Sequence, residues 1–298
     1  MRLWQHACTL QPDNGSVTQI MAMTHPPSVC DHLGIITVTG EDAESFLQGQ
    51  LTSTITGLAP GDNRLAMHLS LKGRAMASFR VIRTATGFDL VTPRGNLEAA
   101  LKGLAKYALF SKAELAEDTT RQVIGIGDET LARDSDAIRL SGPGEPRWLL
   151  LGEAPADSTD GSAWRQQEIL AGEAQIYPGG EDLWLPQVLN YDLLEGVHFN
   201  KGCYLGQEVV ARMHFKGSLK QRMRRWQWPG HSAPATGTVV RNSDGKALGE
   251  VVQAVTTDGQ VDALVVVRLD HDGELFIDDV PLGATEQALP YTLPADGK

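Results

Sequence analysis

The residues best suited to chemistry lie together in one short stretch, FNKGCYLGQEVVAR at positions 199–212. Cys203 follows Lys201 by two positions, and the residues from Gln207 onward have helical character. We therefore expect Cys203 at or just before a helix N-terminus. A nearby lysine and a helix N-terminus both favour the thiolate, which is the nucleophilic and metal-binding form of cysteine. The alternative is a buried, unreactive cysteine, because free cysteine is among the most buried residue types.

A run of basic side chains follows this stretch. Positions 212–225 hold no acidic residue and a local charge of +6, carried by Arg212, Lys216, Lys220, Arg222, Arg224 and Arg225. Such a strip can bind an anion, and the candidates are a polyglutamate tail, a segment of tRNA or an acidic partner protein. The alternative is a solvated connector that leads into the C-terminal part of the chain.

The whole chain is acidic, and its composition is that of a globular protein. It has 298 residues, of which 42% are apolar and 21% charged, and a net charge of −11. These values exclude disorder as the main state and argue against a general nucleic-acid or membrane coat. No apolar run approaches the roughly 20 residues that a membrane helix needs. Three scattered cysteines, Cys8, Cys30 and Cys203, indicate free thiols in a reducing compartment, so we expect a cytoplasmic protein.

A metal site built from neighbouring residues is not expected. The chain has no Cys-x-x-Cys pair, which argues against a closed zinc site or a cysteine-rich iron–sulfur site, and no stably bound metal is predicted. Cys203 alone remains a candidate ligand for a transient or shared cluster. His198 lies five positions before Cys203, but an isolated histidine is more often structural than catalytic, so a Cys–His pair is not expected.

The elements that must position these residues fall into two parts. The pattern of the first part predicts an α+β region with strands at 35–39, 65–71, 75–82 and 88–92 and helices at 41–48, 97–107 and 162–171. After about position 221 the chain alternates turns with short β segments at 224–228, 236–241, 248–255, 262–269 and 275–277. We expect an α+β region at 1–221 and a small antiparallel β-barrel at 222–298.

The stretch around Cys203 also resembles the signature of a known family. Lys-Gly-Cys-Tyr-x-Gly-Gln-Glu is similar to the motif of the YgfZ family of folate-binding, iron–sulfur-related proteins, and the chain carries it unbroken as Lys201, Gly202, Cys203, Tyr204, Gly206, Gln207 and Glu208, with Arg212 in the segment that follows. Residues 40–52, 71–74 and 185–187 resemble further family segments, so the similarity covers nearly the whole chain.

The resemblance implies a fold and a role. The fold is that of the aminomethyltransferase T-protein of glycine cleavage, in which two interwoven α+β subdomains and a C-terminal barrel surround a central folate channel. The implied role is that of an accessory factor for iron–sulfur protein assembly or repair, which supports iron–sulfur enzymes including those that thiolate tRNA. Tetrahydrofolate is the implied ligand, Cys203 is the implied working thiol, and Lys201 is expected to tune it.

The implied folate contacts are only partly kept in this sequence. Trp164 matches a proposed contact of the family, although plain core packing is the alternative, and Leu33 stands where the family has a second aromatic contact. The glutamate that relatives place two positions before Gly172 is Leu170 here. Glu168 is two helical positions away, about 200° around the axis, so we expect it to face elsewhere.

A transferase reaction is the main alternative function. T-proteins carry a carboxylate for methylene transfer just after the glycine turn, whereas residues 73–80 of this chain include none. General acid–base catalysis needs such a group within hydrogen-bond reach. Whether the protein is an enzyme is therefore left open, with a folate-dependent aminomethyl or one-carbon transferase and a folate-binding regulator without chemistry as the alternatives.

Overall fold

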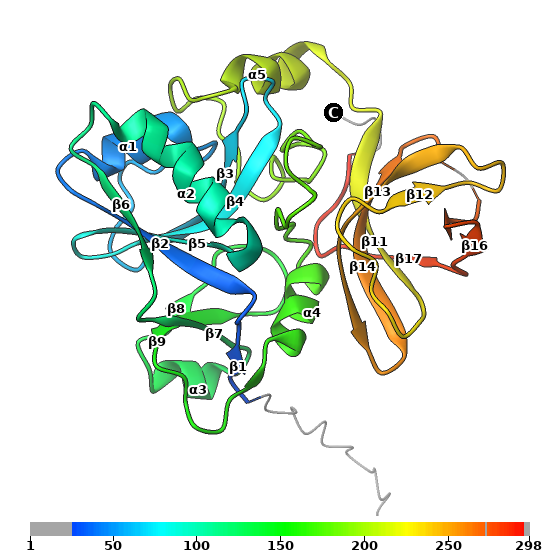
Figure 1. Cartoon of the computed structure of the whole chain (residues 1–298), viewed down its shortest axis with the longest axis horizontal. Coiled ribbons are helices and arrows are strands. Elements are labelled where there is room, and N and C mark those ends of the chain that lie inside the picture. Colours follow the sequence, from blue (N-terminus) through cyan, green and yellow to red (C-terminus); the bar gives the residue numbers. More distant parts are fainter. Residues whose placement is uncertain (1–25, 272, 295–298) are drawn as a thin grey trace, which may run out of the picture.

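The computed structural model describes residues 26–271 and 273–294 of the chain. Cys8 lies outside the described residues. Two sheets from the N-terminal part lie on one side of the molecule and a third sheet, from the C-terminal part, lies on the other, with α4 (Ser162–Leu170) and an irregular segment between them (Figure 1). Within the described parts of the chain, no helix is long and apolar enough to cross a membrane.

The first sheet is a five-stranded antiparallel sheet whose core lies under two helices. Its strand order is β3-β4-β5-β2-β6, with β2 (Leu33–Thr39), β3 (Asn63–Leu69), β4 (Ala75–Arg83), β5 (Gly87–Pro93) and β6 (Glu114–Asp118). The helices are α1 (Ala43–Gln50) and α2 (Arg94–Ala108). Apolar side chains from both helices pack with alternate residues of the strands, for example Leu47 and Leu104 with Phe79.

The second sheet is interwoven with the first along the chain. Its order is β10-β1-β7-β9-β8, with β1 (Ser28–Val29), β7 (Gln122–Ile126), β8 (Ile138–Arg139), β9 (Trp148–Gly152) and β10 (Thr159–Asp160). A short helix, α3 (Glu129–Arg133), follows β7. Because β1 precedes the whole first sheet but pairs with β7 and β10, the chain leaves one subdomain, builds the other and returns. The α+β fold with interwoven subdomains is confirmed.

The C-terminal sheet is curled but open. Its order is β16-β15-β12-β13-β14-β11-β17, with β11 (Gln221–Pro229), β12 (Val239–Arg241), β13 (Ala247–Thr257), β14 (Gln260–Arg268), β15 (Phe276–Ile277), β16 (Val280–Pro281) and β17 (Thr285–Gln287). All its pairs are antiparallel, and the edge strands β16 and β17 are not paired with each other among the described residues. The expected barrel is therefore a half-barrel.

The strand β14 is apolar on both of its faces because both are covered. Val265 and Val267 belong to the core inside the half-barrel, which also contains Trp226. Leu264 and Val266 point the other way, into the central core that joins this sheet to the rest of the molecule. Since successive strand residues point to opposite faces, this continuous apolar run is what a strand buried on both sides requires.

Candidate functional site

Cys203 lies on an exposed loop before α5 (Gln207–Lys216). The helix begins four residues after Cys203, so this cysteine lies before the helix N-terminus and not within its first turn. Gly206 separates the two, with a left-handed φ of 78°. A Cβ on Gly206 would lie 2.6 Å from the carbonyl oxygen of Ser70, so only glycine fits here.

The alternative of a buried cysteine is wrong for Cys203, which is exposed. Cys30 is the buried cysteine of the described residues: it is 1% exposed, and burial raises the pKa of its thiol.

Lys201 anchors this loop to the end of α1. Its ammonium donates hydrogen bonds to the carbonyl oxygens of Gln48 and Leu51, at 2.6 and 2.5 Å. In return the Gln48 side-chain amide donates to the carbonyl oxygen of Lys201 at 2.9 Å. Carbonyl groups at a helix C-terminus lack partners within the helix and attract a cation. Burial lowers the pKa of Lys201 to about 7. The ammonium thus points to α1, and its expected effect on the Cys203 thiol stays a prediction.

The other signature residues hold the loop and begin the helix. Tyr204 is buried in the central core, and its ring lies 5.1 Å from the Lys201 ammonium. The backbone amide of Gln207 donates to the carbonyl oxygen of Tyr204. Gly202 has a left-handed φ of 92°, and the exposed Glu208 lies in the first turn of α5, where a negative charge is favourable. These residues therefore fix the backbone on both sides of Cys203.

His198 is held by partners other than Cys203. Its Nδ1 lies 3.1 Å from the Ser53 hydroxyl and 3.2 Å from the Thr54 backbone amide, and its Nε2 lies 3.1 Å from a guanidinium nitrogen of Arg64. Burial and the charge of Arg64 lower the pKa of His198. Both ring nitrogens are thus engaged in positioning the segment before the signature.

The basic run at 212–225 is not one continuous anion-binding strip. Arg222 is fully buried and pairs with Asp192 at 2.8 Å, and Arg224 pairs with Glu286 at 2.9 Å. The remaining arginine of the strand, Arg225, pairs with Asp262. These cations lie on β11, in the interior of a sheet, where the neighbouring strands β17 and β14 and, for Arg222, an irregular segment supply acids that the local sequence does not reveal.

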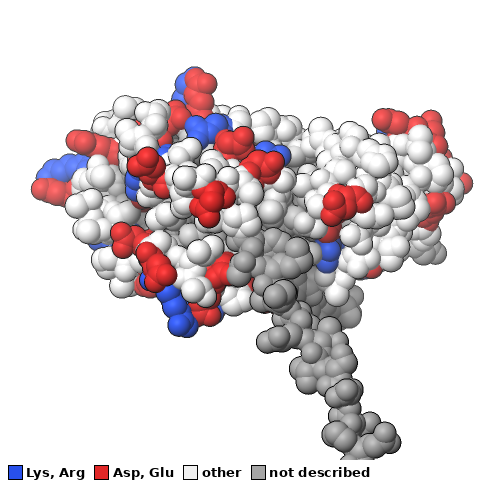
Figure 2. Space-filling model, turned by 90° about the horizontal axis from the view of Figure 1, so that it is seen from below, with Lys and Arg blue, Asp and Glu red and all other residues white. Residues whose placement is uncertain are grey.

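Three cations of the run remain exposed, namely Arg212, Lys216 and Lys220. Figure 2 shows another face of the molecule, on which acidic side chains are spread widely and basic ones lie among them in small groups. Within the run at 212–225, the exposed charge is thus limited to α5 and the residues just after it.

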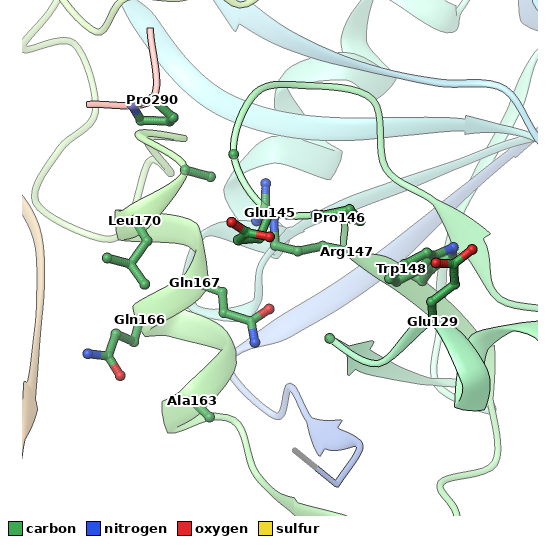
Figure 3. A pocket seen from close by; sticks show the side chains of 13 residues that line it. Glu129, Glu145, Pro146, Arg147, Trp148, Ala163, Gln166, Gln167, Leu170 and Pro290 are labelled. Atoms are coloured by element: carbon green, nitrogen blue, oxygen red, sulfur yellow. The ribbon is translucent and has the colours of Figure 1, made fainter. Parts of the chain in front are cut away.

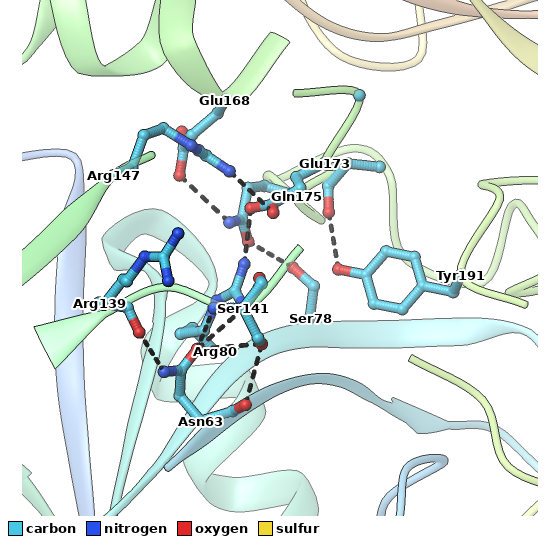
Figure 4. A network of polar contacts seen from close by, with 12 residues as sticks. Asn63, Ser78, Arg80, Arg139, Ser141, Arg147, Glu168, Glu173, Gln175 and Tyr191 are labelled. Atoms are coloured by element: carbon cyan, nitrogen blue, oxygen red, sulfur yellow. Dashed lines mark hydrogen bonds and ion pairs between the residues drawn. The ribbon is translucent and has the colours of Figure 1, made fainter. Parts of the chain in front are cut away.

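A buried ion-pair network at the centre of the molecule was not predicted. The carboxylate of Glu173 accepts from Arg80 at 2.7 Å and from Arg147 at 2.8 Å (Figure 4). All three side chains are at most 5% exposed. Burial alone would raise the pKa of Glu173, but the guanidinium groups of Arg147 and Arg80 hold it below its usual value. The only sign of this network in the sequence is Arg80 itself, a charged residue within a largely apolar strand.

Polar side chains extend this network to the C-terminal sheet. The Ser78 hydroxyl donates to the amide oxygen of Gln175 at 2.9 Å, and the Gln175 amide donates to Glu168 at 3.3 Å. The backbone amide of Gln175 donates to Gln253 of β13 at 2.8 Å. The segment after α4 is thereby tied to both halves of the molecule.

A cavity of about 610 Å³ lies beside α4. One face of this helix forms a wall through Ala163, Gln166, Gln167 and Leu170, and residues 144–148 lie opposite. Figure 3 shows Gln167 extending from α4 toward the segment that carries Arg147. The Gln167 Oε1 and Arg147 Nη1 atoms are both buried without a hydrogen-bond partner. A polar ligand in this cavity would supply partners for both atoms.

The two expected folate contacts lie behind this cavity. Trp164 and Leu33 are 2% and 1% exposed and belong to one apolar cluster. A Cβ on Gly125 would lie 2.1 Å from the Trp164 ring, so the chain packs directly on it. Leu170 is 41% exposed at the cavity, whereas Glu168 is 3% exposed and faces the core. The expectation that Glu168 faces away from Leu170 is confirmed, and a folate contact with Trp164 or Leu33 stays a prediction.

The described residues contain no group of three or more histidine, cysteine or acidic side chains that could hold a metal ion. Cys203 therefore offers a single thiol.

Comparison with solved structures identifies the fold as that of an aminomethyltransferase T-protein. The glycine cleavage system aminomethyltransferase T from Bartonella henselae matches with a TM-score of 0.69 and 17% identity, over 92% of this chain and 89% of that chain. Proteins named tRNA-modifying protein YgfZ are closer in sequence. The one from Vibrio atlanticus is 31% identical over 243 residues, 72% of this chain and 73% of that protein, and the one from Escherichia fergusonii is 30% identical over 88% and 92%. The chain belongs to the YgfZ family, although no family model matches it.

Burial of Lys201 leads to a testable titration. After methylation with carbon-13-labelled formaldehyde, the NMR signal of Lys201 should titrate with a midpoint near 7, because burial disfavours the charged ammonium. The reference is the value of about 10.4 that is usual for a lysine in water. The Lys201→Met variant assigns the signal. A Lys201 midpoint near the usual lysine value of about 10.4 would contradict the result expected from burial.

Proposed function

We propose that this protein is an accessory factor for iron–sulfur enzymes that modify tRNA, with Cys203 as its working thiol and a folate as its ligand. The observation that carries the proposal is the exposure of Cys203 on a loop that Lys201, Tyr204 and Gly206 hold in place. Membership of the YgfZ family, whose relatives are named tRNA-modifying proteins, supports the tRNA part of the proposal. A cytoplasmic location fits the same role.

A single exposed thiol suits a role in transfer. A thiolate can exchange with a disulfide or persulfide of a partner, or ligate an iron–sulfur cluster that the partner also holds. The proposed partners are therefore iron–sulfur enzymes or the proteins that assemble their clusters. Arg212, Lys216 and Lys220 form the exposed cationic face near this loop, where a tRNA segment or a polyglutamate tail would bind.

Tetrahydrofolate fits the chemistry of the cavity beside α4. The lactam edge of a pterin offers an N–H donor beside a carbonyl acceptor, which matches the amide of Gln167, and Arg147 Nη1 can donate to a carbonyl or carboxylate of the ligand. The cavity volume lies within the range of about 300–1,000 Å³ that is usual for such ligands. When bound, tetrahydrofolate would supply a carrier for one-carbon units. Since residues 73–80 hold no carboxylate, the accessory role is favoured over aminomethyl transfer.

Complementation tests the role of the thiol. In a bacterial strain that lacks its own YgfZ protein, the wild-type chain should restore the thiolated nucleosides of tRNA, measured by mass spectrometry. The Cys203→Ala variant should restore less than about a tenth of that level, because the reactive thiol is lost. The matched control is Cys30→Ala, which removes a buried thiol and should complement normally. Full complementation by Cys203→Ala would contradict the thiol role and favour a folate-binding regulator without thiol chemistry.

Calorimetry tests the folate site. Tetrahydrofolate should bind the wild-type protein, and Gln167→Leu should weaken binding about tenfold, the equivalent of one lost hydrogen bond to a buried group. Leu170→Glu should tighten binding, because it returns an acceptor for pterin N–H groups to the cavity wall. Gln260→Leu, on the exposed start of β14, is the matched control and should bind as the wild type does. Absence of binding to the wild type, or equal affinity of Gln167→Leu, would contradict a folate site here.

A further inference from the structure

A second cavity, of about 320 Å³, lies between α2 and the hairpin that joins β3 to β4. It shares no lining residue with the cavity beside α4. One face of α2 forms one wall, the hairpin residues 68–72 form the other, and Leu205 of the signature loop closes one side. Leu205 lies two positions after Cys203, so this cavity borders the loop that carries the exposed thiol.

The lining of this cavity is largely apolar and partly open to solvent. Leu69, Met76 and Leu205 contribute apolar side chains to its wall. At its mouth, Leu71 is 78% exposed and Tyr107 is 38% exposed. Large apolar side chains that gather at the mouth of a concave site are typical of a ligand-binding surface.

His68 places a polar group in this apolar wall. It is 4% exposed, and its Nε2 is buried without a hydrogen-bond partner. A buried polar atom without a partner is unfavourable, and a ligand that pairs with it removes that cost. Gly103 lies beside the imidazole, in the interior of α2, where glycine is less favourable than alanine. A Cβ on Gly103 would lie 3.3 Å from His68 Cε1, so glycine keeps space open beside the ring.

The charge near His68 is positive. Burial and, to a smaller extent, the charge of the nearby Lys106 lower the pKa of His68 to about 4. The imidazole is therefore neutral at physiological pH and can offer one donor and one acceptor. Lys106 lies 5.3 Å from the ring of Tyr107 and makes no ion pair with the described residues. The lining also contains a second lysine, Lys72, and two acids whose carboxylates are held by neutral donors, Asp182 by the Ser70 hydroxyl and Glu181 by a backbone amide.

We propose that this cavity binds a small aromatic acid, a ligand with one or two rings and an anionic substituent. The rings would lie among the apolar side chains and beside Gly103, a polar atom of the ligand would pair with His68 Nε2, and the anionic group would face Lys106. The site is separate from the folate cavity and does not depend on the proposed function. A ligand held here would contact Leu205 and so the loop of Cys203.

Two fluorescent probes of matched shape test this site. Anilinonaphthalene sulfonate carries the anionic group, and phenylnaphthylamine has the same rings without it. Both should bind the full-length protein with saturable fluorescence enhancement. Gly103→Leu fills the cavity and should weaken the binding of both probes at least about tenfold. His68→Phe removes the ring nitrogens and should also weaken the binding of both probes. Lys106→Gln, at an exposed position, should weaken the binding of the sulfonate probe alone, by about three- to fivefold at low salt.

The control is Gly49→Leu, which makes the same change in α1 at a position where a Cβ meets no atom within 4 Å. It should bind both probes as the wild type does. Circular dichroism checks that each variant is folded, and if Gly103→Leu is not, His68→Phe and Lys106→Gln decide. The proposal is overturned if neither probe binds saturably, or if the folded cavity variants bind both probes with wild-type affinity.

Discussion

The structure depends on one buried carboxylate. Glu173 lies between Arg80 of the first sheet and Arg147 at the start of β9, and its backbone carbonyl accepts from Gln253 of the C-terminal sheet. Removing one partner of a buried ion pair lowers the stability of the folded protein by about 3–5 kcal/mol. The network therefore favours one arrangement of the three sheets. That arrangement fixes α4 against residues 144–148, the two walls of the cavity that we assign to folate.

Most signature residues hold the backbone of the loop in place, and Cys203 provides an exposed thiol. Lys201 holds the end of α1, Tyr204 fills the central core and Gly206 lets the loop approach the β3–β4 hairpin. Only Cys203 is left exposed with a reactive group. The motif is therefore best understood as a support that presents one thiol in a fixed position, next to a cavity whose wall includes Leu205.

Local patterns in the sequence predicted the elements well, because alternation along strands such as β4 and β14 and the helical spacing in α2 depend on near neighbours. The same reasoning failed where the partners are distant in the sequence. The pair of Arg222 with Asp192 and that of Arg225 with Asp262 turned an expected anion strip into part of a sheet. The Glu173 network was missed for the same reason, since Arg80 lies on β4 and Arg147 just before β9, far apart in the sequence.

The cavity that we propose for folate contains no residue of the Cys203 loop, so folate should bind beside α4 without contacting residues 201–206. An NMR map of the backbone and side-chain amides during titration with tetrahydrofolate tests it most directly. We expect shifts in α4, at the Gln167 side-chain amide and in residues 144–148, with no shifts at 201–206. Shifts centred on 201–206, with α4 and the Gln167 amide unchanged, would contradict the account.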